Sequence, residues 1–166
     1  MTKLRKLYIH QMPSKKDMGD IDPKDLEILS KTNEPYVIVG SAGIYMHLGQ
    51  DKGTLEILAD QNIGGIKRVK KTELHRLAKH YDAIKNTAED INIKGKNYKV
   101  ASLPYLIAVN RERKHLPTAL IELAKSGKVD RALAEDIRCM LKVTDQKEEW
   151  TDFLQLLYDF APNLLE

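Results

Sequence analysis

The chain has 166 residues, of which 42% are hydrophobic and 31% charged, and this balance is ordinary for one globular domain with its own core. The formal net charge of +3 is too small to indicate a nucleic-acid-binding protein by itself. No apolar run approaches the roughly 20 residues of a membrane helix, and none follows the basic N-terminus as in a signal peptide. We therefore expect a cytoplasmic protein with no membrane span.

The single cysteine, Cys139, cannot form a disulfide within the chain, which agrees with a cytoplasmic protein. Cys139 lies inside an apolar pattern with helical spacing. That position favours a buried core cysteine over a reactive thiol.

The N-terminal residues 1–20 are basic and hold a short apolar patch, so they form either an edge strand or a loosely attached arm. Asp22 and Pro23 predict the start of a helix that ends near Thr32, because Asp caps helices and Pro suits their first position. The β-branched run 36–39 lies between a proline and a glycine, which is typical of a strand buried on both faces.

Local patterns predict the elements that follow as well. They are a short helix over 42–48, a strand over 54–59, a helix over 72–81 capped by Thr72, and a hairpin of strands 89–93 and 97–101. Ser102 caps the next helix, and further helices fill 117–126 and the region from Val129 to Phe160. We expect residues 21–115 to form an α/β core and residues 116–166 to form C-terminal helices packed on it.

A strand, a glycine turn and a helix meet at Gly40-Ser41, and a second strand follows. Glycine lets the backbone approach a ligand closely, and the N–H groups at the start of a helix favour an anion such as phosphate. A carboxylate on the neighbouring strand would then hold Mg²⁺ against that phosphate, because Mg²⁺ takes oxygen ligands and few protein carboxylates. Glu56 is placed for this role.

Residues 35–113 resemble the nucleotidyltransferase superfamily, in particular its small prokaryotic members related to abortive-infection and antitoxin-linked proteins. The family pattern is a Gly-Gly or Gly-Ser turn, a helix often ending in His and Gly, and Arg-x-Thr-x-Asp-x-Asp on the second strand. The matching residues are Gly40-Ser41, His47, Gly49 and the segment 52–58. The stronger match is the segment 96–108, which is similar to the family's strand leading into Ser-Leu-x-x-Leu-Ile-Ala. The resemblance implies a nucleotidyltransferase-like mixed sheet flanked by helices, with Mg²⁺ and a nucleoside triphosphate as substrate or ligand.

The chain departs from this pattern where catalysis is concerned. The family's first catalytic carboxylate maps to Glu56, but the second maps to Leu58, which cannot bind a metal. The arginine before the strand is Lys52, which keeps the charge without the bidentate geometry. Asn110 replaces a common lysine, and three basic residues follow it: Arg111, Arg113 and Lys114. Because nucleotidyl transfer relies on bound metal ions, the resemblance implies reduced or lost catalysis.

Other carboxylates are candidates to complete the site. Asp60 is a weak second metal ligand, because it lies four residues beyond Glu56, roughly 13 Å along a strand. Asp90 is our candidate for a third carboxylate, with Asp82 as the alternative, and both are otherwise surface acids. The predicted site therefore comprises catalytic residues Glu56 and Asp90, metal ligands Glu56 and Asp60, and nucleotide-binding residues Gly40, Ser41, Lys52 and Thr54.

Three functions follow as hypotheses. The first is a nucleotidyltransferase-fold protein with reduced or lost catalysis that binds a nucleotide or RNA in a defence or toxin–antitoxin system. The second is an active Mg²⁺-dependent nucleotidyltransferase. The third is a module whose C-terminal helices bind a protein partner or a second copy through Trp150, Phe153 and Leu157, unless these side chains pack on the core. Two basic clusters, Lys67 to Lys71 and Lys94 to Lys99, either contact phosphate or form a solvated face.

Overall fold

Five short strands form one mixed sheet in the computed structural model, which describes residues 19–113 and 118–165. The strands are β1 (Val37–Ile38), β2 (Glu56–Leu58), β3 (Lys67–Arg68), β4 (Glu89–Ile93) and β5 (Lys96–Val100), in the order β3-β2-β1-β5-β4. β1 runs antiparallel to β2 and parallel to β5, while β2 and β3 are parallel. The central strand β1 is fully buried, as its β-branched sequence predicts.

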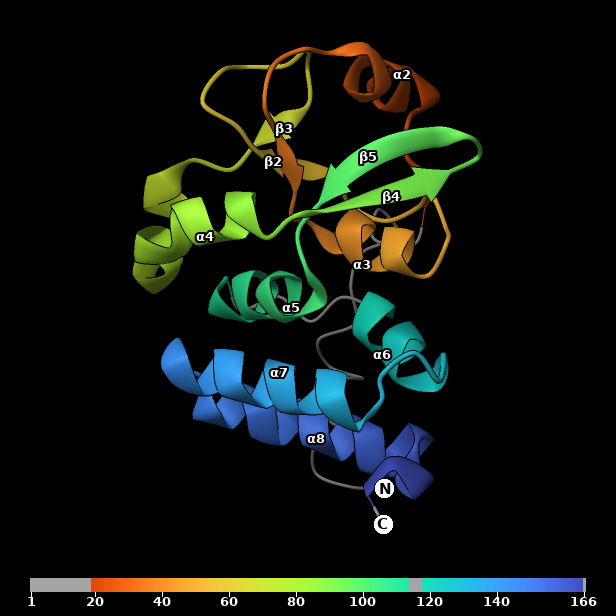
Figure 1. Ribbon diagram of the computed structural model, residues 1–166, viewed down its shortest axis with the longest axis vertical. Helices are drawn as coiled ribbons and strands as arrows, with labels where there is room; N and C mark the ends of the chain where they lie inside the picture. Colours follow the sequence, from red (N-terminus) through yellow and green to blue (C-terminus); the bar gives the residue numbers. More distant parts are fainter. Residues whose placement is uncertain (1–18, 114–117, 166) are drawn as a thin grey trace.

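Helices cover both sides of this sheet (Figure 1). The helix α2 (Pro23–Lys31) lies on one side, and α3 (Ser41–His47) and α5 (Leu103–Glu112) lie on the other. The Asp22 side chain accepts a hydrogen bond of 2.9 Å from the backbone N–H of Lys24, which confirms the predicted cap of α2. The mixed α/β architecture expected from the sequence is therefore present in the described residues.

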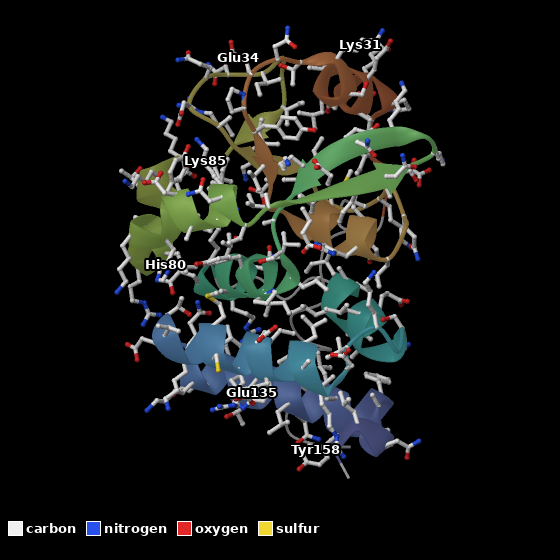
Figure 2. All side chains as sticks on the ribbon, viewed as in Figure 1. Lys31, Glu34, His80, Lys85, Glu135 and Tyr158 are labelled. Atoms are coloured by element: carbon white, nitrogen blue, oxygen red, sulfur yellow. The ribbon has the colours of Figure 1, made fainter. Side chains whose placement is uncertain are left out.

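The C-terminal helices form a further layer beyond α3 and α5 (Figure 1). They are α6 (Thr118–Lys125), α7 (Arg131–Val143), α8 (Lys147–Phe160) and the 3-10 helix η3 (Pro162–Leu165). Phe153 and Leu157 on α8 are almost completely buried, so two of the three side chains expected to anchor a partner belong to the core. Tyr158 is 55% exposed and points outward from α8 (Figure 2).

The predicted hairpin is present as β4 and β5, although β5 begins at Lys96, one residue earlier than predicted. Lys94 and Gly95 both have positive φ angles, 52° and 86°, which is the geometry of a two-residue turn matched to the strand twist. In the resulting register, Asn92 pairs with Asn97 and Glu89 with Val100.

The predicted helix over 72–81 is wrong in type and extent. Two short 3-10 segments on either side of a non-helical His75 (φ 52°, ψ −119°) make up η2 (Lys71–His80), and a separate helix, α4 (Tyr81–Asn86), follows it. The Glu73 side chain, rather than Thr72, caps η2 by accepting a 3.0 Å hydrogen bond from the backbone N–H of Lys70. Leu74 and Leu77 lie on either side of this kink, and both are buried.

The expectation of a buried cysteine is also wrong, because Cys139 is exposed. On α7 the buried positions are Ala134, Ile137 and Leu141, so Cys139 lies on the opposite face of the helix. The predicted N-terminal arm falls almost entirely on residues 1–18, which lie outside the described part of the chain. Within the described residues, no helix has the length and apolarity that crossing a membrane requires.

Candidate functional site

The turn at Gly40-Ser41 is closed by the segment that leads into β2. Its backbone is joined to this segment by hydrogen bonds from Val39 N to Glu56 O (2.9 Å) and from Ala42 N to Thr54 O (3.1 Å). The Ser41 hydroxyl accepts a further bond of 2.8 Å from Thr54 N. The turn, the start of α3 and the approach to β2 therefore form one rigid unit.

Only glycine fits at position 40. A Cβ atom on Gly40 would lie 2.3 Å from the carbonyl oxygen of Thr54 and 3.2 Å from Cγ of Glu56. The close approach thus brings the turn directly against the candidate carboxylate. Both Gly40 and Ser41 are buried, so the turn itself presents little surface to a ligand.

Glu56 is buried and forms two ion pairs through one carboxylate oxygen. Its side chain is only 7% exposed, and its Oε2 atom lies 2.8 Å from Nη1 of Arg113 and 3.2 Å from Nζ of Lys67. Lys67 stands opposite Glu56 in the parallel register of β2 and β3, and Arg113 follows the last residue of α5. The hydrogen bond from the backbone of Lys70, together with the charges of Arg113, Lys67 and Lys70, lowers the pKa of Glu73. Three cations and two carboxylates therefore gather around Glu56.

Leu58 follows two residues after Glu56 and points to the same face of β2, because side chains alternate along a strand. Its side chain is completely buried. This position contributes packing and no oxygen ligand.

The other candidate carboxylates lie elsewhere. Asp60 accepts a 2.8 Å hydrogen bond from the Tyr81 hydroxyl and faces Lys85 at 3.4 Å. The hydrogen bond from Tyr81, supported by Lys85, lowers the pKa of Asp60. Burial, together with the bond to Asp60, raises the pKa of Tyr81 to about 12.

Asp90 is on β4, where it pairs with Lys99 at 2.9 Å, and β1 and β5 lie between β4 and the strand of Glu56. Asp82 is exposed on α4. The structure thus brings Gly40, Ser41, Thr54 and Glu56 together. Asp90 lies on β4, the edge strand farthest from β3. Among the described residues, no three His, Cys, Asp or Glu side chains form a group that could hold a metal ion.

Several other basic residues of the sequence predictions have defined partners, whereas Lys114 lies outside the described residues. The Lys52 ammonium lies 4.9 Å from the centre of the Tyr45 ring, a cation–π contact. Arg111 pairs with Asp152 at 2.7 Å, which ties α5 to α8. In the second basic cluster, Lys94 pairs with Asp51 and Lys99 with Asp90.

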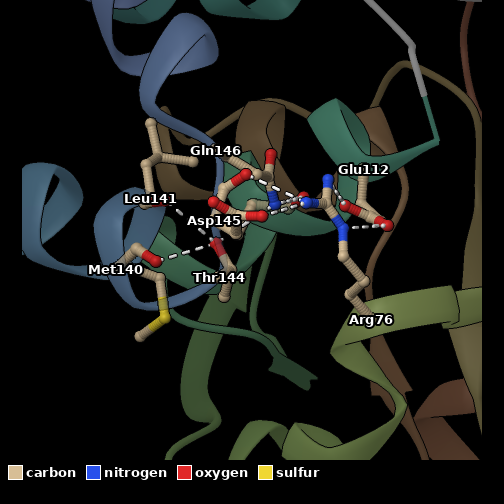
Figure 3. Close-up of polar contacts among 8 residues, drawn as sticks. Arg76, Glu112, Met140, Leu141, Thr144, Asp145 and Gln146 are labelled. Carbon is tan, nitrogen blue, oxygen red and sulfur yellow. Dashed lines mark hydrogen bonds and ion pairs between the residues drawn. The ribbon is translucent and has the colours of Figure 1, made fainter.

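A second polar cluster joins the sheet layer to the C-terminal helices (Figure 3). Arg76 donates two hydrogen bonds to the Glu112 carboxylate, at 3.1 and 2.9 Å, and further bonds to Asp145. Gln146 follows Asp145 in the turn between α7 and α8, is completely buried, and donates a 3.0 Å hydrogen bond to the carbonyl oxygen of Ala108. These contacts hold η2, the end of α5 and the turn between α7 and α8 together.

A cavity of about 610 Å³ lies between the start of α5 and α7. His47 lines it, and its Nε2–H donates a 2.9 Å hydrogen bond to the carbonyl oxygen of Ala101. Burial lowers the pKa of His47. Lys128 also lines the cavity and donates to the carbonyl of His47 at 2.7 Å. The cavity lies at the first turn of α5, whereas Arg113, which contacts Glu56, follows the last turn of the same helix. The cavity is therefore separate from the Glu56 site.

Glu56 and the Gly40-Ser41 turn were predicted from the sequence, but the ion pairs of Arg113 and Lys67 with Glu56 were not. The only signal was the density of basic residues around positions 67–71 and 111–114. The site is a closed glycine turn beside one buried, doubly paired carboxylate. Comparisons of the chain with models of protein families, with curated proteins and with solved structures found no match.

Proposed function

We propose that this chain is a nucleotidyltransferase-like protein that binds a nucleotide or RNA through phosphate and has lost nucleotidyl transfer. The observation that carries the proposal is the pairing of Glu56, the one acid retained from the family's motif, with Arg113 and Lys67. The antiparallel β1 and β2, joined through the Gly40-Ser41 turn and α3, are compatible with the fold that the resemblance implies.

Loss of transfer follows from the chemistry of the residues on β2. Two-metal transfer needs several oxygen ligands close together, since the two ions stabilise the attacking and leaving oxygens. Leu58 supplies no oxygen, and Glu56 has cations on Oε2. We therefore expect no measurable transfer of a nucleoside monophosphate.

Phosphate binding is supported by the charges around the turn. Three cations, Arg113, Lys67 and Lys70, stand against two carboxylates, Glu56 and Glu73, so one positive charge remains in this cluster. Arg113 is 22% exposed and Lys67 is 60% exposed, so both reach solvent while Glu56 does not. Arginine and lysine bind phosphate oxygens through charge-assisted hydrogen bonds, which are stronger than neutral ones.

Isothermal titration calorimetry with the four nucleoside triphosphates tests the proposal, and fluorescence anisotropy with a short single-stranded RNA tests the RNA ligand. Arg113→Met should weaken binding by about tenfold or more, since a hydrogen bond to a charged group contributes about 1.5–3 kcal/mol. Lys99→Met is the matched control, because Lys99 is also partly exposed and paired with a carboxylate, but on β5, which β1 separates from β2. Failure of every ligand to bind would refute the proposal.

An active transferase is the rival function, and it needs Asp60 or Asp90 to join Glu56 at one metal site. In the structure these acids pair with Tyr81, Lys85 and Lys99 instead. Incubation of the protein with labelled triphosphates, Mg²⁺ and cell lysate separates the two functions. A labelled acceptor that disappears with Glu56→Gln would establish the rival.

A further inference from the structure

The Mg²⁺ ion that the resemblance implies does not fit the residues around Glu56. Mg²⁺ requires near-octahedral oxygen coordination and is usually held by one or two carboxylates together with waters and phosphates. The Oε2 atom of Glu56 already contacts both Arg113 and Lys67, and the neighbouring position on the same face is Leu58. The carboxylate of Glu56 therefore has positive charge beside it before any ion arrives.

We propose that Arg113 and Lys67 take the place of the metal, so that the site binds phosphate without a divalent cation. This inference rests on the proposed function and specifies how the site binds its ligand. In it, Glu56 is a positioning residue that orients the two cations, and the cations contact the phosphate oxygens directly.

The donor groups available on the two cations support this role. A guanidinium has five N–H donors in a fixed plane, and the contact of Arg113 with Glu56 uses Nη1. The ammonium of Lys67 has three donors and approaches the same Oε2 atom while its side chain stays largely exposed. Both groups can therefore keep their contact with Glu56 and still donate to a second anion.

The positions of the cations are fixed by three separate elements. Lys67 is held by the pairing of β3 with β2, Glu56 is buried on β2, and Arg113 directly follows α5. A ligand thus meets charges that are already placed, which reduces the entropy lost on binding. A resident metal would instead have to displace Arg113 from the carboxylate.

The substitution Glu56→Gln separates a positioning role from metal ligation. Glutamine has nearly the same shape and still accepts a hydrogen bond from Arg113, but it removes the negative charge. We expect Glu56→Gln to bind triphosphate as tightly as the unaltered chain or more tightly, because the site becomes more positive. If Glu56 were a metal ligand, the same substitution would weaken Mg²⁺-dependent binding.

The experiment is a calorimetric titration of the full chain with ATP, GTP, CTP and UTP, each in Mg²⁺ and in EDTA. Affinities that agree within about twofold in the two buffers, together with a loss of about tenfold or more in Arg113→Met, support the inference. Binding that needs Mg²⁺, or that Glu56→Gln abolishes, overturns the inference and leaves the proposed function standing. Circular dichroism checks each variant; if Arg113→Met does not fold, the Mg²⁺ comparison and Glu56→Gln decide.

A titration with Mn²⁺, followed by the electron paramagnetic resonance signal of the free ion, tests the site without any nucleotide. We expect the unaltered chain and Glu56→Gln to give the same titration, because Glu56 takes no ion. Saturable Mn²⁺ binding that Glu56→Gln removes overturns the inference. If neither the four triphosphates nor the single-stranded RNA binds, the proposed function is refuted, and this titration alone decides the metal question.

Discussion

The two ion pairs on Glu56 permit a quantitative test, because both cations contact the same oxygen atom. Arg113 is 2.8 Å and Lys67 is 3.2 Å from Oε2. By Coulomb's law these distances alone change the attraction by only about 14%. The exposed fractions differ far more, 22% for Arg113 and 60% for Lys67, so solvent screening decides which pair is stronger.

We therefore expect unequal coupling energies. The pair of Glu56 with Arg113 is largely shielded from water, and a hydrogen bond between charged groups in such a place contributes about 1.5–3 kcal/mol. The pair with Lys67 reaches solvent, and exposed ion pairs contribute about 0.2–1 kcal/mol. The expected difference of roughly 1–2 kcal/mol exceeds the usual error of additivity, about 0.3–0.5 kcal/mol.

Double-mutant cycles measure these couplings. Urea unfolding is recorded for the unaltered chain, for Glu56→Met, Arg113→Met and Lys67→Met, and for the two double variants that include Glu56→Met, because methionine removes both the charge and the hydrogen-bond acceptor. Repetition at high salt should reduce the Lys67 coupling and leave most of the Arg113 coupling, because exposed charges are screened more strongly. A Lys67 coupling equal to or larger than that of Arg113 would refute this reasoning.

Three further outcomes follow from burial and backbone geometry. Phe153→Ala should destabilise the chain by about 3–5 kcal/mol, since the Phe153 side chain is 2% exposed. Tyr158→Ala on the same helix should change the stability by about 0.5 kcal/mol or less. Thermal unfolding compares the two variants, and equal effects would show that α8 is not part of the core. Burial lowers the pKa of His47 below its usual 6.5, so the unfolded chain binds more protons than the folded chain. The stability should therefore fall as the pH drops below about 6.5. Denaturation at several pH values should show a weaker dependence of stability on pH for His47→Gln. Gly40→Ala should destabilise the chain by about 1–3 kcal/mol, because its Cβ would meet a carbonyl oxygen at 2.3 Å. Gly65→Ala is the control, because no atom lies within 4 Å of the added Cβ. A Gly40→Ala variant as stable as the unaltered chain would mean that the turn is looser than described.

Much of the fold could be predicted because the signals are local. The run 36–39 predicts β1, Asp22 and Pro23 predict the start of α2, and the Lys94-Gly95 turn predicts the hairpin. The failures occurred where local signals are weak or ambiguous. β3 has two charged residues and no strand pattern, and its pairing with β2 creates it.

Part of the candidate site was equally accessible from the sequence. The turn at Gly40-Ser41 and the carboxylate of Glu56 belong to one continuous unit of strand, turn, helix and strand, so short-range geometry brings them together. That position 58, two residues beyond Glu56, is a leucine and offers no oxygen ligand was also visible without a structure. The sequence by itself thus indicated the glycine turn and the carboxylate beside it.

Only the tertiary structure decided what that carboxylate contacts. Arg113 is 57 residues from Glu56 along the chain and reaches it because α5 ends over β2, while Lys67 reaches it through the register of two short strands. Strand order likewise places β1 and β5 between Glu56 and Asp90, which no local pattern indicates. The physical reason is that charge pairing depends on long-range packing, whereas turns, caps and strand runs depend on neighbours in sequence.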